Sequence, residues 1–241
     1  MVAIASTATN FGVAGTSRTC NAPASIAAGD GLLCVITNVH DSNSGAAEIT
    51  GPAGWTRQIS QNHDYGYYAI FTRTAEAADE SATDYTFTHN GSDTPQNWSI
   101  SITRVSDFGG WGTVASQLNG QASGSSGAVT NHVCPTVTTP ADLALLITCI
   151  CDSSGYQAAS GYTPPGGHAE SIDFRATGSP YSGYTGQVVG SEEIASAGAT
   201  GTRTWTTGVA THGYGFSIYA LDYVPGGGGS ILPFVNRRFY S

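Results

Sequence analysis

Histidine, aspartate and serine stand together at residues 40–42, and these are the side-chain types of a hydrolytic triad. Neighbouring residues of a strand or turn point in different directions, so three consecutive positions do not form a triad. The adjacent polar pairs at 63–64 (His-Asp) and 79–80 (Asp-Glu) lie in segments that we expect to be solvated turns. The sequence also lacks the nucleophile elbow, the zinc-protease motif, the P-loop and the dinucleotide fingerprint. We therefore predict no catalytic residues.

Metal-binding patterns are equally weak. The segment DSNSG at 41–45 resembles a calcium loop, but its glycine comes one position early and no glutamate closes the loop. Ordinary turn chemistry explains the same residues, so calcium near Asp41 or Asp152 stays an open alternative. The cysteines lack zinc-site spacing, and we expect them to be reduced thiols packed as small apolar side chains. They are Cys20, Cys34, Cys134, Cys149 and Cys151. No metal and no cofactor are predicted.

The charge of the chain excludes one class of partner. Its eight basic residues are all arginines, and its formal net charge is -9. An acidic chain without a basic stripe does not neutralise phosphates, so nucleic acid is not an expected partner. No apolar stretch approaches 18 residues, and the N-terminus lacks the charged and apolar regions of a signal peptide. We expect no membrane partner, and synthesis in a cytoplasm without standard secretion.

The remaining pattern is that of short antiparallel strands. Residues 98–105, WSISITRV, alternate apolar and polar side chains with the period of a half-buried strand. Only residues 74–85 have helical composition, and without an apolar stripe they predict a loop or one short turn. Turn residues separate the other β-branched and aromatic runs. The sequence predicts an all-β protein of antiparallel, jelly-roll-like β-sandwiches.

The second half of the chain repeats landmarks of the first half in the same order. They comprise a turn aspartate, an apolar strand, a second aspartate, a Gly-aromatic-Thr element, a Thr-rich strand and a closing strand. The pairs are Asp30 with Asp142, Asp41 with Asp152, GWT at 54–56 with GYT at 161–163, DYTFTHNG at 84–91 with TRTWTTG at 202–208, and SITRVSDF at 101–108 with SIYALDY at 217–223. Conserved order through these landmarks predicts two related β-sandwich domains that superpose strand for strand.

These repeats set the expected domains. We place an N-terminal arm at 1–14, the sandwiches at 15–113 and 133–224, and a flexible Gly/Ser-rich connection at 114–132. In each Gly-aromatic-Thr element the glycine permits a tight bend, and the aromatic residue plugs the end of its sandwich. Trp55 and Tyr162 are therefore expected at equivalent, largely buried positions. The alternative is that these aromatics form a platform for sugar rings.

Residues 225–241 differ from everything before them, because a run of four glycines is followed by a short apolar segment with two arginines. A peptide of this length cannot bury itself, and Pro233 disfavours a helix. We expect an anchor that docks in extended form on another subunit or another protein. Its contact residues would be Ile231, Leu232, Phe234, Val235, Arg237, Arg238, Phe239 and Tyr240.

The ordered segments of the first half resemble a pattern found in tailed-bacteriophage structural proteins. The matching motifs are Gly-Asp-x-Leu-Leu at 29–33, Pro-x-Gly-Trp-Thr at 52–56 and Tyr-Thr-Phe-Thr at 85–88, and the resemblance covers residues 20–223. The second copy departs from it, with Tyr162 in place of tryptophan. The resemblance implies a virion protein with tandem β-sandwiches and no catalytic residues.

The sequence thus predicts a non-enzymatic virion component, either a head decoration protein or a minor tail or fibre protein. It would be made in the host cytoplasm and assemble as a homo-oligomer, with a trimer as the leading form, and its C-terminal segment would bind other virion proteins. The alternative is a carbohydrate-binding module or adhesin that recognises glycans of the host surface through exposed aromatic side chains.

Overall fold

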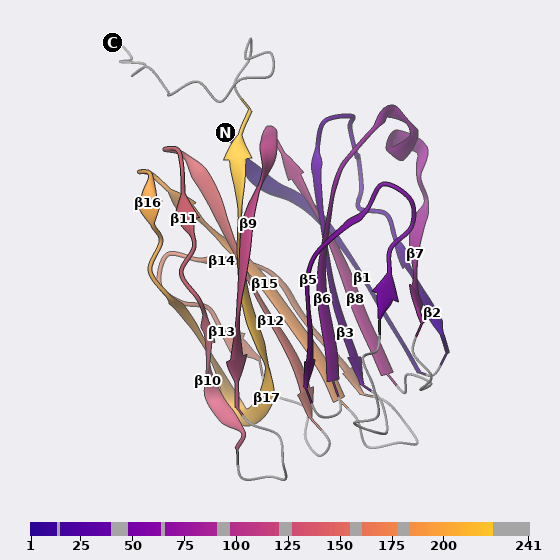
Figure 1. Cartoon of the computed structure of the whole chain (residues 1–241), viewed down its shortest axis with the longest axis vertical. Coiled ribbons are helices and arrows are strands. Elements are labelled where there is room, and N and C mark those ends of the chain that lie inside the picture. Colours follow the sequence, from indigo (N-terminus) through magenta and orange to yellow (C-terminus); the bar gives the residue numbers. More distant parts are fainter. Residues whose placement is uncertain are drawn as a thin grey trace.

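Nearly all of the described chain forms β-strands. The computed structural model describes residues 1–13, 15–39, 48–63, 66–90, 97–120, 127–154, 161–177 and 184–223. Figure 1 shows antiparallel sheets stacked as layers, so the expected all-β fold is confirmed. The 3-10 helix η1, Ala77–Ser81, lies in the segment expected to form a loop or short turn. No helix among the described residues is long and apolar enough to cross a membrane.

Five strands of the first half form one inner sheet in the order β1-β8-β3-β6-β5. Three short strands form an outer sheet, β2-β7-β4, over one face of this inner sheet. The inner strands are β1 (Ala3–Val13), β3 (Gly31–Val39), β5 (Thr56–His63), β6 (Gly66–Thr74) and β8 (Asn97–Ser106); the outer strands are β2 (Ser17–Asn21), β4 (Ile49–Thr50) and β7 (Asp84–His89).

The second half repeats this arrangement with one fused strand. The C-terminal part of β17 (Arg203–Asp222) lies between β9 and β12 in an inner sheet that continues through β15 to β14. Its N-terminal part pairs with β10 and β13, so β17 takes the places of both β7 and β8. The other strands are β9 (Phe108–Asn119), β10 (Val129–Cys134), β11 (Thr138–Thr139), β12 (Ala144–Ser154), β13 (Tyr162–Thr163), β14 (Ala169–Thr177), β15 (Tyr184–Ile194) and β16 (Gly198–Ala199).

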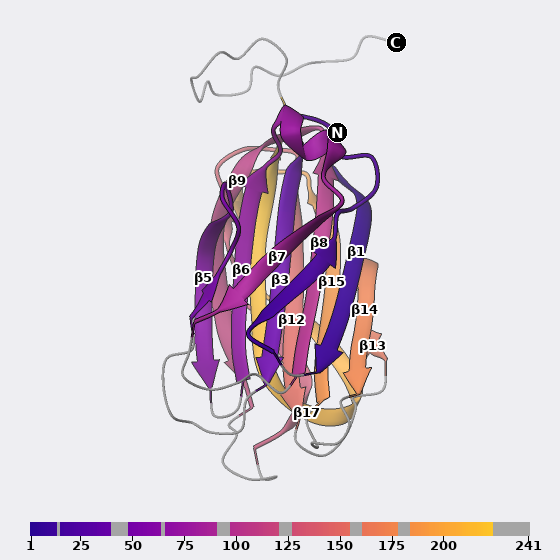
Figure 2. The same ribbon diagram turned by 90° about the vertical axis from the view of Figure 1, so that its right-hand side faces the viewer.

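The two inner sheets pack face to face, which makes a stack of four layers (Figures 1 and 2). Strand β3 shows how side chains are divided between the layers. Leu33 and Val35 enter the central core shared with the second half. Leu32, Cys34 and Ile36 enter the core under the first outer sheet. Because both faces of β3 are covered, all nine of its residues are buried.

This stacking corrects the expected orientation of β8, whose polar face was predicted to meet solvent. Ser99, Ser101 and Thr103 are fully buried between the inner sheets. Gln187 of β15 donates to the Ser99 carbonyl oxygen at 2.8 Å and to the Val35 carbonyl oxygen at 3.1 Å. The interface between the halves therefore contains a buried set of hydrogen bonds, which fixes how the two sheets align.

The expected domain boundaries are also corrected. The predicted N-terminal arm is strand β1, which pairs with β8 along its whole length. Asp107 alone separates β8 from β9, and its φ of 51° turns the chain from one inner sheet into the other. Residues 108–119, expected partly in the first domain and partly in a flexible connection, form strand β9 of the second inner sheet.

The two outer cores are filled by different side chains at matching positions. In the first core Phe71 of β6 packs edge-on against Phe87 of β7, with ring centroids 5.2 Å apart. In the second core β15 has Gly190 at the place of Phe71, and the larger Trp205 stands at the place of Phe87. A Cβ on Gly190 would lie 2.7 Å from the Trp205 ring. The tryptophan thus fills the space that the missing phenylalanine leaves.

Candidate functional site

The turn after the outer strand β4 and the turn after its counterpart β13 have the same geometry. Residues 49–59 and 162–172 correspond one to one, since β5 and β14 carry a register shift at the same place, before Ile59 and Ile172. Trp55 donates its backbone N–H to the Pro52 carbonyl, as His168 does to the Pro165 carbonyl, both at 3.1 Å. Gly54 and Gly167 have left-handed φ values of 85° and 88°, which favour glycine.

This correspondence corrects the expected pairing of Trp55 with Tyr162. Trp55 matches His168, and Tyr162 matches Ile49, because the two similar Gly-aromatic-Thr triplets lie on opposite sides of the turn. Tyr162 is buried, with 5% of its surface exposed, and Trp55 is half-buried. Each ring nevertheless packs on an outer core of its own half.

A buried polar cluster surrounds Tyr162 in the second half. The Tyr162 hydroxyl donates to Asp152 Oδ2, and both residues are buried. The Arg175 guanidinium carbon lies 5.0 Å from the centroid of the Tyr162 ring, which is cation–π geometry. The Tyr162 backbone N–H donates to Asp173 Oδ2 at 3.1 Å, and Asp173 is also the ion-pair partner of Arg175.

Burial shifts the titration of this cluster. Desolvation raises the pKa of the Asp152 carboxyl, an effect that the hydrogen bond from Tyr162 and the charge of Arg175 partly oppose. Desolvation also raises the pKa of Tyr162 well above its ordinary value. His132, whose ring centroid lies 6.0 Å from that of Tyr162, has its pKa lowered by burial to about 4. The cluster is therefore neutral at His132 and at the tyrosine in ordinary conditions.

At the places of Asp152, Tyr162 and the cross-strand partners of Asp152, the first half carries no charged group. Asp152 pairs with Gly186 and Gly213 on its two neighbouring strands. At the corresponding positions of the first half, Asn38 pairs with Tyr67 and Trp98. A Cβ on Gly186 would lie 2.1 Å from Asp152 Oδ1, so the glycine makes room for the acid. The pairs, first half before second, are Asn38 and Asp152, Ile49 and Tyr162, Tyr67 and Gly186, and Trp98 and Gly213.

The geometry of the cluster gives it a structural role. Tyr162 already donates its proton to Asp152, and the Nε2 atom of His132 lies 3.0 Å from the Thr211 hydroxyl. The buried groups are thus engaged with one another and close the end of the second outer core. In the described part of the chain, no three His, Cys, Asp or Glu side chains gather as a metal site.

The other residues considered for chemistry have varied positions. The segments 40–42 and 41–45 and residue Asp64 lie outside the described residues. Asp79 was expected in a solvated turn, but it is buried and bonded by Arg73 Nη2 at 2.8 Å and by the Tyr85 hydroxyl at 2.8 Å. Those two bonds hold η1 against the first outer core. Local pattern could not predict this arrangement, because Arg73 and Tyr85 belong to strands β6 and β7 and meet Asp79 only in the folded structure.

The cysteines confirm the expectation of free, buried thiols. Burial raises the pKa of the Cys20 and Cys151 thiols to about 12, so both are protonated at neutral pH. They pack as apolar side chains in the outer and central cores.

None of the four tryptophans is largely exposed. Trp98 and Trp205 are fully buried, and Trp55 and Trp111 are half-buried. The predicted contact residues 231–240 of the C-terminal anchor lie outside the described residues.

Comparisons with known proteins bring no further identification. No protein-family model, curated protein or solved structure matches the chain.

Proposed function

We propose that this protein is a non-enzymatic structural component of a virus particle of the tailed-bacteriophage type, either a head decoration protein or a minor tail or fibre protein. The observation that carries the proposal is the four-layer stack, whose two halves share one central core. Such a stack is a rigid body with little to rearrange. A rigid body followed by a glycine spacer and an apolar, arginine-containing segment suits a building block that is tethered to its neighbours.

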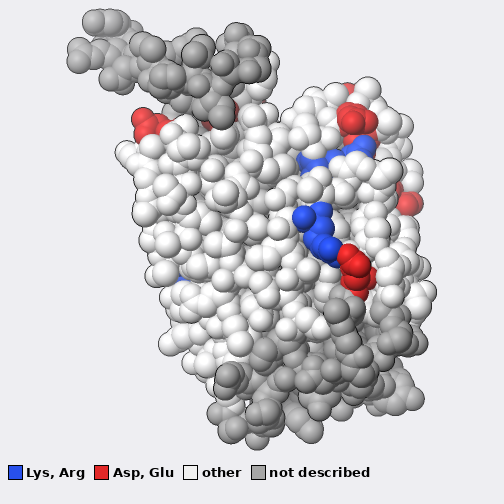
Figure 3. Space-filling view, in the orientation of Figure 1, with Lys and Arg blue, Asp and Glu red and all other residues white. Residues whose placement is uncertain are grey.

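The surface supports the same proposal. Large areas of the face in Figure 3 carry neither acidic nor basic side chains. The outward side chains of the outer sheets are mainly short and polar, such as Thr86 and Thr88 on β7 and Thr204 and Thr206 on β17. Low surface charge removes one barrier to association between identical copies. We propose a homo-oligomer, with a trimer as the leading form, that joins other virion proteins after synthesis in the host cytoplasm.

Recognition of host glycans, the alternative from the sequence, lacks a supporting observation in the described residues. A sugar platform needs an accessible aromatic face, and Tyr223 is the aromatic residue whose exposure is large, at 57%.

The proposal is tested by deleting residues 226–241. The full chain and the truncated chain are compared by sedimentation velocity over a hundredfold range of concentration, and their folds by circular dichroism and thermal melting. We expect equal melting temperatures, oligomers of the full chain and monomers of the truncated chain. In particles from the native source, a labelled antibody against the outer sheets should bind at regular positions. If the truncated chain assembles like the full chain, the anchor is refuted.

A further inference from the structure

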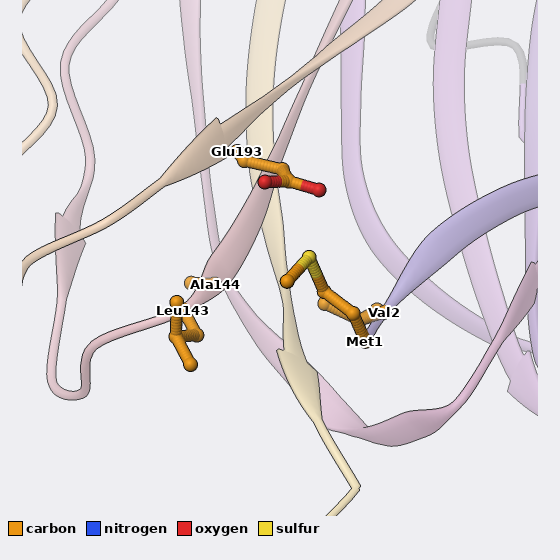
Figure 4. Close-up of a pocket in the computed structure, with 5 residues that line it drawn as sticks. All are labelled: Met1, Val2, Leu143, Ala144 and Glu193. Atoms are coloured by element: carbon orange, nitrogen blue, oxygen red, sulfur yellow. The ribbon is translucent and has the colours of Figure 1, made fainter. Parts of the chain in front are cut away.

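The exposed large apolar side chains of the described residues are gathered at one end of the molecule. They are Met1, Leu143 and Tyr223, exposed by 61%, 42% and 57%. Met1 and Leu143 line one shallow pocket (Figure 4). Asp107 connects this pocket with Tyr223. Its carboxylate binds the Met1 amino group at 3.3 Å, and its backbone carbonyl oxygen accepts a hydrogen bond from the Tyr223 backbone N–H at 2.8 Å. We call this surface the end patch; its apolar residues are Met1, Val2, Leu143, Ala144 and Tyr223.

The backbone at Leu143 holds its side chain in this exposed place. Leu143 has a φ of 59°, in the left-handed region that is unfavourable for a leucine. The next residue, Ala144, is buried at the start of β12, so the fold fixes the chain on one side of Leu143. An exposed leucine in a strained backbone conformation does not stabilise the isolated chain. Strained residues of this kind concentrate at ligand clamps and other functional sites.

The end patch is bordered by acidic groups. Glu193 lines the pocket, Asp142 precedes Leu143, and Asp107 and Asp222 lie 3.3 Å and 3.7 Å from the Met1 amino group. Five arginines form ion pairs with acids elsewhere: Arg57 with Glu48, Arg73 with Asp79, Arg104 with Asp30, Arg175 with Asp173, and Arg203 with Glu192. The patch thus combines apolar side chains with an excess of negative charge.

We propose that the end patch is the docking site for the C-terminal segment, residues 231–241, of a neighbouring copy of this protein. The segment offers the complementary chemistry, apolar anchors such as Phe234 and the adjacent cations Arg237 and Arg238. Its apolar side chains cover the end patch, and its arginines pair with the carboxylates around it. This inference rests on the proposed function, which it extends by naming the receptor surface.

The position of the patch argues for exchange between copies. The chain leaves the described structure at Tyr223, within the patch itself, so donor and acceptor lie at the same end of each copy. Residues 224–230, which include the four glycines, span at most about 24 Å. Copies that meet at this end can each give one segment and receive one. Every patch is then covered, and a closed cyclic oligomer results.

The test traps the contact with a disulfide. One chain carries Leu143→Cys, and a second, uniformly labelled with heavy nitrogen, carries Phe234→Cys. The five native cysteines are buried and do not compete. The two chains are mixed while dilute, concentrated and oxidised gently, and linked peptides are identified by mass spectrometry. We expect peptides that join position 143 of one chain to position 234 of the other. Thr88→Cys, exposed on the outer sheet, replaces Leu143→Cys in the control and should give at most a tenth of that yield.

A second variant tests the patch without cross-linking. Leu143→Asn introduces a residue that tolerates the left-handed backbone at this position, so thermal melting should show an intact fold. We expect its oligomer to dissociate at concentrations at least tenfold higher than the wild type.

The outcomes separate this inference from the proposed function. A third chain carries both Leu143→Cys and Phe234→Cys. If this chain links only within itself while the two single-cysteine chains stay unlinked, the segment folds back on its own patch and the exchange is overturned. If deletion of 226–241 abolishes assembly but Leu143→Asn and the trapping experiment show no effect, the receptor surface is wrong and the proposed function stands. If the deletion itself has no effect on assembly, the anchor of the proposed function is refuted, and this docking site fails with it.

Discussion

Replacing Gly190 by alanine tests whether Trp205 occupies the space of an absent side chain. Gly190 lies in strand β15, and its added Cβ would lie 2.7 Å from the Trp205 ring and 3.0 Å from the Ala169 carbonyl oxygen. Both distances are shorter than ordinary van der Waals contacts, and the neighbouring strands leave the ring little room. The substitution must therefore move either the tryptophan or the β14 backbone.

The expected magnitude follows from two opposing effects. Glycine to alanine within a strand ordinarily stabilises the fold by about 0.5–1 kcal/mol. Overpacking of a filled core costs about 1–3 kcal/mol. Because the clash involves a rigid ring, we expect overpacking to prevail, with a net loss of about 1–2 kcal/mol in the free energy of unfolding. For a chain of this size the melting temperature should fall by about 3–6 °C.

A double-mutant cycle isolates the contact. Trp205→Phe removes the ring atoms nearest to Gly190, but it also loses the hydrogen bond from Trp205 Nε1 to the Thr148 hydroxyl, 3.0 Å long. We expect this single change to cost about 2 kcal/mol. The double mutant should be more stable than the sum of the single effects by about 1 kcal/mol, with rescue incomplete because the Ala169 carbonyl remains.

Guanidinium unfolding followed by circular dichroism measures all three variants. Gly166→Ala is the matched control, because its added Cβ meets nothing within 4 Å, and its stability should change by less than about 0.5 kcal/mol. Strict additivity of the two changes, or a neutral Gly190→Ala, would refute the space-filling relation between Gly190 and Trp205.

Three further predictions concern the buried side chains, each measured as the free energy of unfolding. Tyr162→Ala should cost about 3–5 kcal/mol, and Tyr162→Phe about 1–3 kcal/mol because Asp152 loses its hydrogen-bond donor. Truncation of the half-buried Trp55 should cost less than truncation of Tyr162. If Tyr162→Ala and the wild type unfolded with equal free energy, the role of Tyr162 in the core would be contradicted. His132 has an ordinary pKa of 6.5 and a folded pKa of about 4, so the unfolded chain binds more protons between these values. Stability should therefore fall on acidification from pH 6.5 to 4 by at most about 3 kcal/mol from this group, and His132→Gln should flatten that slope. Burial raises the pKa of Asp152, so the contribution of this carboxyl to stability falls as pH rises from about 3.9, its unfolded pKa, through the raised folded value. Asp152→Asn should therefore be neutral or stabilising at pH 7. A large loss of unfolding free energy in Asp152→Asn at pH 7 would show that the fold requires the ionised carboxylate.

The all-β fold follows from local pattern. Strand period, turn residues and the absence of an apolar helical stripe act within a few residues, so they could be recognised in the sequence alone. The repeated order of landmarks also appears in the sheet topology, where the order β1-β8-β3-β6-β5 corresponds to β9-β17-β12-β15-β14. The buried state of the cysteines was predicted for the same reason, since their segments are apolar strands.

The residue-by-residue alignment of the two halves could not be predicted from local sequence pattern. The triplets around Trp55 and Tyr162 look alike, yet Tyr162 corresponds to Ile49, because cross-strand partners and the shared bulge decide equivalence. The replacement of Phe71 by Gly190 in the second half is likewise explained only by its contact with Trp205, which is distant in sequence.

The sequence by itself determined that this protein consists of two related sets of antiparallel strands. Only the tertiary structure decided what each strand face meets. Ser99 and Ser101 alternate with apolar residues as a solvent-facing row would, but they are buried against the second inner sheet. Similarly, the arm-like N-terminus is the edge strand β1. The physical reason is that strand period reports the alternation of side chains, whereas burial depends on which layers stack on either side.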